Sequence, residues 1–202
     1  NKEFINCINY LKKTKKSLHL LGLLSDGGVH SHYGHLFHIV NILKKMHMEN
    51  VFIHSFLDGR DTAPNKGIES IKKLSVLIRD SKIKLATIMG RYYSMDRDMR
   101  WDRVKLAYDA MVRGKGVKSY NLHDSIKKSY DKNVFDEFIL PTVGMEKDKP
   151  ICKINDGDVV FTYNFRSDRM RQLTSVLTQK DFTKHKMKKK KLYFLTMTNY
   201  DE

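Results

Sequence analysis

The chain has 202 residues, of which 41% are hydrophobic and 30% are charged, a balance that excludes an intrinsically disordered protein. Its two cysteines, Cys7 and Cys152, exclude a disulfide framework and are typical of a reducing compartment, which we expect to be the cytoplasm. The net charge of +15 suggests an anionic partner. No apolar run approaches the ~20 residues of a membrane-spanning helix.

Short apolar runs without helical periodicity predict buried strands, and apolar residues at helical spacing predict amphipathic helices between them. In chain order the predicted elements are a helix at 4–16, a strand at 18–24, a helix at 34–48, a strand at 51–57, a helix at 68–78, a strand at 84–89, a helix at 104–112, a strand at 158–164, a helix at 169–177 and a strand at 192–198.

This alternation predicts the α/β class, with a mostly parallel sheet covered by helices on both faces. The stretch 114–157 has no clear periodicity apart from a short helix near 121–131, and we expect it to form a small irregular subdomain or flap. No internal repeat or linker divides the chain, so residues 1–202 are predicted to be one domain.

Lysine and arginine are distributed differently along the chain. Four lysines lie in 11–16 and seven in 180–191, which are typical of solvated surface runs. Eight of the ten arginines lie instead in 58–62, 90–103 and 164–171, segments without a lysine. Because the planar guanidinium binds carboxylate and phosphate through paired hydrogen bonds, this sorting indicates a site for an oxyanion.

These three segments, together with the polar segment 25–38, follow four of the predicted strands. In open α/β sheets ligands bind outside the carboxyl ends of the strands. We therefore expect the four loops to meet at one edge of the sheet. No Walker A or Gly-x-Gly-x-x-Gly pattern indicates a nucleotide.

The loop sequences closely resemble those of the cofactor-independent phosphoglycerate mutases. The resemblance rests on four motifs in this order: Gly-Gly-Val-His-Ser-His at 27–32, Leu-Asp-Gly-Arg-Asp at 57–61, Gly-Arg-Tyr-Tyr at 90–93 and Asn-Phe-Arg-x-Asp-Arg at 164–169. Asp-Glu-Phe at 136–138 and Met-Thr-Asn-Tyr-Asp at 197–201 are also similar to the family.

The resemblance implies an enzyme that interconverts 3- and 2-phosphoglycerate in glycolysis through a phosphoserine. It also implies that this chain is only the inserted phosphotransferase domain. We expect the domain to be a monomer that binds no metal ion and no membrane. The alkaline-phosphatase-like domain, with the serine and two divalent metal ions, usually manganese, is then expected outside residues 1–202. The fragment alone is expected to be inactive.

Carried over residue by residue, the resemblance implies a set of substrate contacts. Asp61 is the expected catalytic residue, which exchanges a proton with the 2- or 3-hydroxyl. Asp26, Asp96, Asp98 and Asp168 are expected to orient arginines. The expected substrate-binding residues are His30, Arg60, Asp61, Arg91, Arg97, Arg166 and Arg169.

Two further interpretations stay open at this point. His30, His32, His35 and His38 lie close in sequence, but a turn and a helix would splay them, so no metal site is predicted there. The lysine runs leave a basic nucleic-acid or anionic-surface binding module as the alternative function, although no nucleic acid is expected as a partner.

Overall fold

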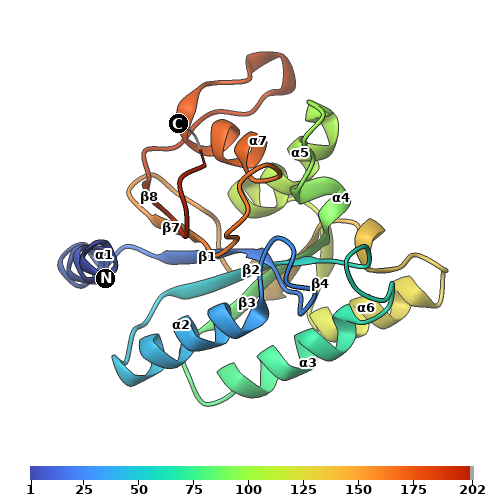
Figure 1. Cartoon of the computed structure of the whole chain (residues 1–202), viewed down its shortest axis with the longest axis horizontal. Helices are drawn as coiled ribbons and strands as arrows, with labels where there is room; N and C mark the ends of the chain where they lie inside the picture. The colour runs from blue at the N-terminus through green and yellow to red at the C-terminus, as the bar shows by residue number, and fades with distance from the viewer. Residues whose placement is uncertain (201–202) are drawn as a thin grey trace.

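Strands and helices alternate along the computed structural model, which describes residues 1–200 (Figure 1). The first half contains α1 (Lys2–Thr14), β1 (Leu18–Leu23), α2 (Tyr33–Lys45), β2 (Val51–Leu57), α3 (Gly67–Ile78), β3 (Lys84–Gly90), α4 (Arg91–Ser94) and α5 (Trp101–Tyr108). The second half contains β4 (Val117–Ser119), α6 (Leu122–Tyr130), β5 (Thr142–Glu146), β6 (Lys149–Pro150), β7 (Val159–Thr162), α7 (Arg171–Thr174) and β8 (Tyr193–Thr196).

The strands form one sheet in the order β4-β5-β3-β2-β1-β7-β8, with β6 paired to β5 outside this path. Strands β3, β2, β1, β7 and β8 are parallel to their neighbours in this series. Strand β5 runs antiparallel to β3, and β4 runs parallel to β5. The sheet is therefore mixed and mostly parallel, as the sequence predicts.

Helices cover both faces of the sheet, which confirms the predicted layers. In Figure 1, α2, α3 and α6 lie below the sheet, and α4, α5 and α7 lie above it. Alternate residues of each central strand enter opposite cores. In β1, for example, Leu20 packs in the core beneath α2 and α3, whereas Leu21 packs in the core beneath α5 and α7.

All five predicted strands and all six predicted helices, including the short one near 121–131, are present, with ends that differ by a few residues. Two of the helices change their winding near their carboxyl ends. Helix α5 continues as a π-helical turn at Asp109–Arg113, and α7 continues as another at Ser175–Gln179. Short 3₁₀ turns occupy Asp136–Phe138 and Thr183–His185.

The prediction for the stretch 114–157 was wrong in one detail, because this stretch does not form a separate subdomain or flap. Strands β4 and β5 belong to the main sheet, and Ile126 of α6 is fully buried in the core beneath α2 and α3. The pairing of Val143 with Thr87 connects residues that are far apart in sequence. A short strand that is stabilised by such distant pairing has little periodicity of its own.

The two ends of the described chain approach each other at one edge of the sheet. Asn1 and Phe4 line the same groove as Leu195, Thr196 and Met197. The ends of a domain that is inserted into another are expected to lie close together, with Asp201 near the beginning of the first helix. Asp201 lies outside the described residues. Among residues 1–200, no helix is long and apolar enough to cross a membrane.

Candidate anion-binding site

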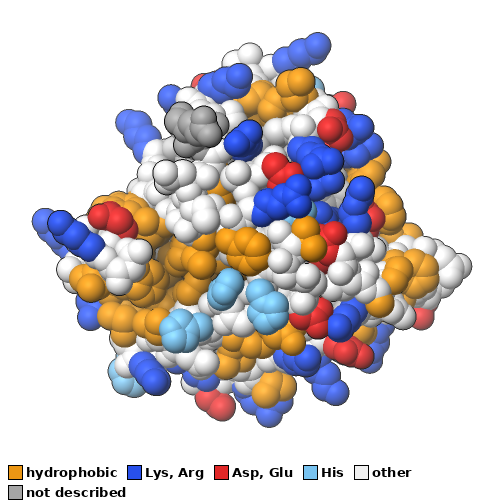
Figure 2. Space-filling view, in the orientation of Figure 1, with side chains coloured by type: hydrophobic (Ala, Val, Ile, Leu, Met, Phe, Trp, Pro, Cys, Tyr) orange, Lys and Arg blue, Asp and Glu red, His pale blue; other side chains and the backbone are white. Residues whose placement is uncertain are grey.

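The four predicted loops begin at the carboxyl ends of four adjacent parallel strands. They follow β1, β2, β3 and β7, so all four loops lie at the same edge of the sheet. Figure 2 shows Lys and Arg side chains, with Asp and Glu between them, gathered in the region where Figure 1 places α4 and α5. This edge is where an open α/β sheet binds its ligand.

Asp58, at the end of β2, shapes the loop that carries Arg60 and Asp61. Its Oδ1 accepts hydrogen bonds from the backbone N–H groups of Arg60, at 3.2 Å, and Asp61, at 3.0 Å. Its Oδ2 accepts one from the hydroxyl of Ser25 at 2.5 Å, which connects the loops after β1 and β2. A carboxylate that caps its own loop in this way is a common device of tight turns.

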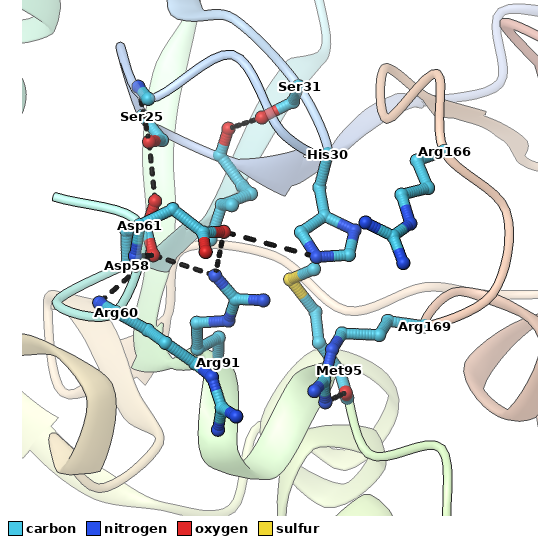
Figure 3. A network of polar contacts seen from close by, with 12 residues as sticks. Ser25, His30, Ser31, Asp58, Arg60, Asp61, Arg91, Met95, Arg166 and Arg169 are labelled. Carbon is cyan, nitrogen blue, oxygen red and sulfur yellow. Dashed lines mark hydrogen bonds and ion pairs between the residues drawn. The ribbon is translucent and has the colours of Figure 1, made fainter.

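Arg91 begins α4 and is only 3% exposed. Its Nη1 donates to Asp58 Oδ1 at 2.7 Å and to Asp61 Oδ2 at 2.5 Å (Figure 3). Burial alone would lower the pKa of Arg91, but the two carboxylates raise it above its usual value. Burial would likewise raise the pKa of Asp58, yet the Asp61 N–H, Ser25 and Arg91 hold it below its usual value. Both groups therefore stay charged, and they fix the orientation of Asp61.

A cavity of about 380 Å³ opens beside this ion pair. Its lining is dominated by guanidinium groups from the loops after β2, β3 and β7. The cavity is lined by Arg60, Arg91, Tyr92, Met95, Asp96, Arg97, Asp98, Arg100, Arg103, Glu137, Phe138 and Arg169.

The pKa of Arg169 reflects how close these positive charges lie to one another. Burial lowers its pKa, and repulsion from Arg91, Arg97 and Arg60 lowers it further. Its Nη1 donates to the carbonyl oxygen of Met95 at 3.1 Å, which turns the side chain toward α4. Gathered like charges repel each other in the free protein, so an anion between them would relieve a cost that is already present.

Arg166 and Arg97 meet on one carboxylate. Arg97 Nη1 and Arg166 Nη2 each lie 3.1 Å from Asp168 Oδ2. Both arginine side chains are about half exposed, at 47% and 49%. Asp168 thus brings together an arginine from the loop after β3 and another from the loop after β7, while leaving donors of each accessible.

His30 lies between the two acidic groups of the site. Its Nε2 is 3.9 Å from Asp61 Oδ2, and its Nδ1 is 3.6 Å from Asp168 Oδ1. Burial, reinforced by Arg91, lowers the pKa of His30 to about 4. Among the described residues, none forms a hydrogen bond with the buried His30 Nδ1, whereas Asp168 Oδ1 lies 3.0 Å from Arg166 Nε. Unpaired buried polar atoms at a pocket are the groups that a ligand or a water molecule satisfies.

The structure brings all seven expected substrate-binding residues into one region. Arg60, Arg91, Arg97 and Arg169 line the cavity, and Asp61 contacts Arg91 at its edge. His30 and Arg166 lie side by side beyond Asp61, as Figure 3 shows. The predicted convergence of loops is therefore confirmed, whereas the role of each residue toward substrate stays a prediction.

The expected supporting role of the aspartates holds for three of four residues. Asp168 binds Arg97 and Arg166, and Asp96 and Asp98 both bind Arg100. The prediction for Asp26 was wrong, because its Oδ2 pairs with Lys66 Nζ at 2.6 Å. Lys66 immediately precedes α3, whose approach to the loop after β1 is not visible in the local sequence.

The sequence interpretation missed part of the cavity wall. Arg100 and Arg103 lie in the arginine-rich segment 90–103, which was the available signal, and Arg103 stacks over the ring of Tyr92 at 3.8 Å from its centroid. Glu137 places Oε1 3.5 Å from Arg60 Nη1. The Glu137 segment approaches so closely that a Cβ at Gly90 would lie 2.0 Å from the Glu137 carbonyl oxygen. Only glycine fits at that position.

The four histidines near residue 30 have separate roles. His30 faces Asp61, whereas His32 Nδ1 accepts the backbone N–H of Gly34 and caps the start of α2. His35 packs edge-on against Phe165, and His38 lines the groove near the chain ends. The predicted splaying is therefore incomplete, because the His32 and His35 rings meet edge-on with their centroids 6.2 Å apart.

Comparison with known proteins decides the family. Residues 1–202 match the family model described as the N-terminus of BPG-independent PGAM. This chain belongs to the cofactor-independent phosphoglycerate mutase family. It is 48% identical over 199 residues to the 2,3-bisphosphoglycerate-independent phosphoglycerate mutase of Flavobacterium johnsoniae, an alignment that covers 98% of this chain and 39% of that protein.

Other relatives show the same partial coverage. The mutase of Clostridium beijerinckii is 48% identical over 192 residues, which cover 95% of this chain and 38% of that protein. A crystal structure of Leishmania mexicana phosphoglycerate mutase, solved at low cobalt concentration, superposes with a TM-score of 0.91 at 28% identity. The superposition covers 100% of this chain and 39% of the Leishmania mexicana chain. The chain thus spans about two fifths of these relatives and corresponds to their N-terminal part.

Proposed function

We propose that residues 1–202 form the substrate-binding phosphotransferase domain of an enzyme that interconverts 3-phosphoglycerate and 2-phosphoglycerate in glycolysis. The relatives named as 2,3-bisphosphoglycerate-independent mutases support this proposal, since they match almost the whole chain. Because the chain spans about 39% of their length, the complete reaction requires residues that it does not contain.

The observation that carries the proposal is the convergence of Arg60, Arg91, Arg97 and Arg169 on one cavity. 3-Phosphoglycerate has a carboxylate and a phosphate at opposite ends of three carbons. Separate guanidinium groups can each take one anion through paired hydrogen bonds. Such a clamp fixes the orientation of the central hydroxyl before phosphoryl transfer.

Asp61 is the proposed catalytic residue of this domain. Its Oδ2 is held by Arg91 and faces His30, so its position is defined in the free protein. From there the carboxylate accepts a proton from the 2- or 3-hydroxyl as that oxygen attacks phosphorus, and returns it in the reverse step. His30, neutral above its lowered pKa of about 4, donates one ring N–H to a substrate oxygen.

The phosphoryl donor belongs to a second, alkaline-phosphatase-like domain of the same polypeptide in this proposal. That domain supplies a phosphoserine and two divalent metal ions, which we propose to be manganese, and the assembled enzyme is a cytoplasmic monomer. The arginine-lined cavity does not fit a divalent cation, because its guanidinium groups repel positive charge. The domain described here is therefore assigned only to binding, orientation and proton transfer.

Calorimetric titration of the chain with 3-phosphoglycerate tests the proposal. We expect saturable binding that weakens in Arg97→Lys and Arg166→Lys, because lysine keeps the charge and loses the planar fork. Their partly exposed side chains favour retention of the fold, which circular dichroism checks. Arg91→Lys is expected to weaken binding as well. Affinity that is equal in wild type and all three variants would contradict the clamp.

The alternative function, a basic nucleic-acid or anionic-surface binding module, receives no support from the family comparisons. In that function, lysines 188–191 would provide the affinity for nucleic acid, and this affinity would fall steeply as the salt concentration rises. Replacement of these four lysines by glutamine should leave 3-phosphoglycerate binding nearly unchanged. A large loss of retention on RNA in this variant, without any binding of 3-phosphoglycerate by wild type, would favour the alternative.

A further inference from the structure

Two buried histidines and a cysteine face one another on the side of the sheet beneath α5 and α7. Among residues 1–200, His19, His54 and Cys152 are the one group of three potential metal ligands whose donor atoms all lie within 4.8 Å of each other. His19 and His54 are 0% exposed, and Cys152 is half-buried. His19 is the second residue of β1 and His54 is the middle residue of β2, whereas the arginine cavity lies beyond the carboxyl ends of the strands.

The distances between the donor atoms are close to those of a tetrahedral zinc site. His19 Nδ1 and His54 Nε2 are 3.0 Å apart, and Cys152 Sγ lies 4.0 Å and 3.9 Å from these two nitrogens. Tetrahedral zinc with ordinary bond lengths requires about 3.3 Å between two nitrogens and about 3.5 Å between nitrogen and sulfur. Shifts of a few tenths of an ångström in each side chain would meet both values.

In each imidazole, the ring nitrogen that points away from the cluster, called the outer nitrogen here, has a partner that suits metal ligation. His19 Nε2 lies 3.3 Å from Asp158 Oδ2, and His54 Nδ1 lies 2.9 Å from Thr87 Oγ1. A carboxylate behind a histidine fixes the ring and increases the basicity of the inner nitrogen. The two inner nitrogens thus point at each other and at the sulfur, away from their outer partners.

The charges of the site favour a dication. Asp158 is 3% exposed, and His19 is the side-chain partner that the structure gives it. Burial, with a contribution from His19, holds the pKa of His54 well below its usual value, so this ring is neutral and offers a lone pair. Burial and Asp158 raise the pKa of Cys152 to about 12, so a thiolate forms there only beside a positive charge.

We propose that His19 Nδ1, His54 Nε2 and Cys152 Sγ form a zinc(II) site that joins the 150–155 segment to the central strands. Without metal, the His54 Nε2–H donates to His19 Nδ1. On binding, the His54 proton moves to Nδ1, where it faces Thr87, and the Cys152 thiol releases its proton to solvent. The charges of zinc(II), the Cys152 thiolate and the Asp158 carboxylate then cancel. A water molecule is the fourth ligand of the zinc.

Titration of the metal-free 202-residue chain with cobalt(II) tests the site directly. We expect one equivalent to produce a thiolate-to-cobalt charge-transfer band and tetrahedral ligand-field bands, and zinc to abolish both. Manganese should displace cobalt poorly, because imidazole and thiolate are ligands that zinc prefers. Cys152→Ser should lose the charge-transfer band. Cys7→Ala, which removes the other buried cysteine, should keep it.

Asp158→Asn provides a second readout that a purely structural cluster would not give. Loss of the carboxylate behind His19 should weaken zinc binding by about 10–100-fold while leaving the cobalt spectrum tetrahedral. Circular dichroism confirms that each variant is folded. A folded wild-type chain that gives no thiolate-to-cobalt band, or an unchanged band in Cys152→Ser, would overturn the proposal. Neither result bears on 3-phosphoglycerate binding at the opposite end of the strands.

Discussion

Arg91 and Asp58 form an ion pair that is almost completely withdrawn from solvent, with exposed side-chain fractions of 2% and 3%. Removal of one member of such a pair leaves an uncompensated buried charge. We therefore expect Arg91→Met to lower the free energy of unfolding by about 3–5 kcal/mol, as measured by urea denaturation. Arg60→Met is the matched control, because the Arg60 side chain is 57% exposed. It should change stability by less than about 0.5 kcal/mol.

Glu137 places a negative charge in a cavity that is otherwise suited to anions. Its contact with Arg60, at 3.5 Å, competes with any ligand carboxylate or phosphate for that guanidinium. Glu137→Gln should therefore tighten 3-phosphoglycerate binding by about 2–5-fold, in keeping with the small energy of a pair whose arginine is exposed to solvent. Glu146→Gln, which breaks an exposed pair with Lys84 outside the cavity, should leave affinity unchanged. Weaker binding in Glu137→Gln would show that the carboxylate contacts the ligand instead.

His30 should titrate far below an ordinary histidine. Its folded pKa is about 4, and the unfolded value is about 6.5. The unfolded chain binds more protons between these values, so the His30 contribution to stability falls as the pH is lowered from about 6.5 to 4. Proton NMR of the imidazole, with His30→Asn for assignment, measures the midpoint. A midpoint near 6.5 would contradict the burial and the Arg91 repulsion described for this ring.

The pKa of Asp136, the residue before Glu137, is raised, whereas that of His30 is lowered. Tyr130 O–H and the Gly67 N–H, at 2.6 Å, donate to its carboxylate, yet burial dominates and raises its pKa to about 6. Because the folded pKa lies above the unfolded value, the folded chain binds more protons between pH 4 and 6. This group therefore costs stability at neutral pH and regains it as the pH falls through 6.

Asp136→Asn isolates this effect from the other titrating groups. When the pH falls from 7 to 5, the stability of wild type relative to the variant should increase by about 1 kcal/mol. Urea denaturation at both pH values gives the two differences. Asp124→Asn, on the exposed part of α6, serves as the control for the same substitution at a surface position. The same difference at pH 7 and pH 5 would refute the raised pKa.

The sequence predicts the central strands and the arginine edge because both are local signals. A buried parallel strand such as Val51–Leu57 is a continuous apolar run, and the loop that follows carries its arginine within three residues. When several such strands are parallel, their loops necessarily share one edge. The convergence of Arg60 and Arg91 required no knowledge of side-chain contacts.

The remaining features depend on register and distant pairing, which the sequence does not specify. His19 meets His54 because β1 and β2 are aligned with Leu21 opposite His54. A shift of one residue would turn one of the two rings to the other face. In the same way, nothing local distinguishes Asp58 from Asp61 as the carboxylate that holds the loop, or shows that Asp26 meets Lys66.

The reversed direction of β5 allows an evolutionary freedom that parallel strands lack. Its first residue, Thr142, pairs with Ile88, and the Gly90 N–H donates to the carbonyl of Ile139 just before the strand. The connection that enters β5 therefore supplies Glu137 and Phe138 to the cavity. The other walls are made by segments that leave a parallel strand and lead into a helix. Lengthening the connection at 131–135 would remodel one wall of the cavity while the arginines stay in place, and would thereby change the size of the anion that fits between them.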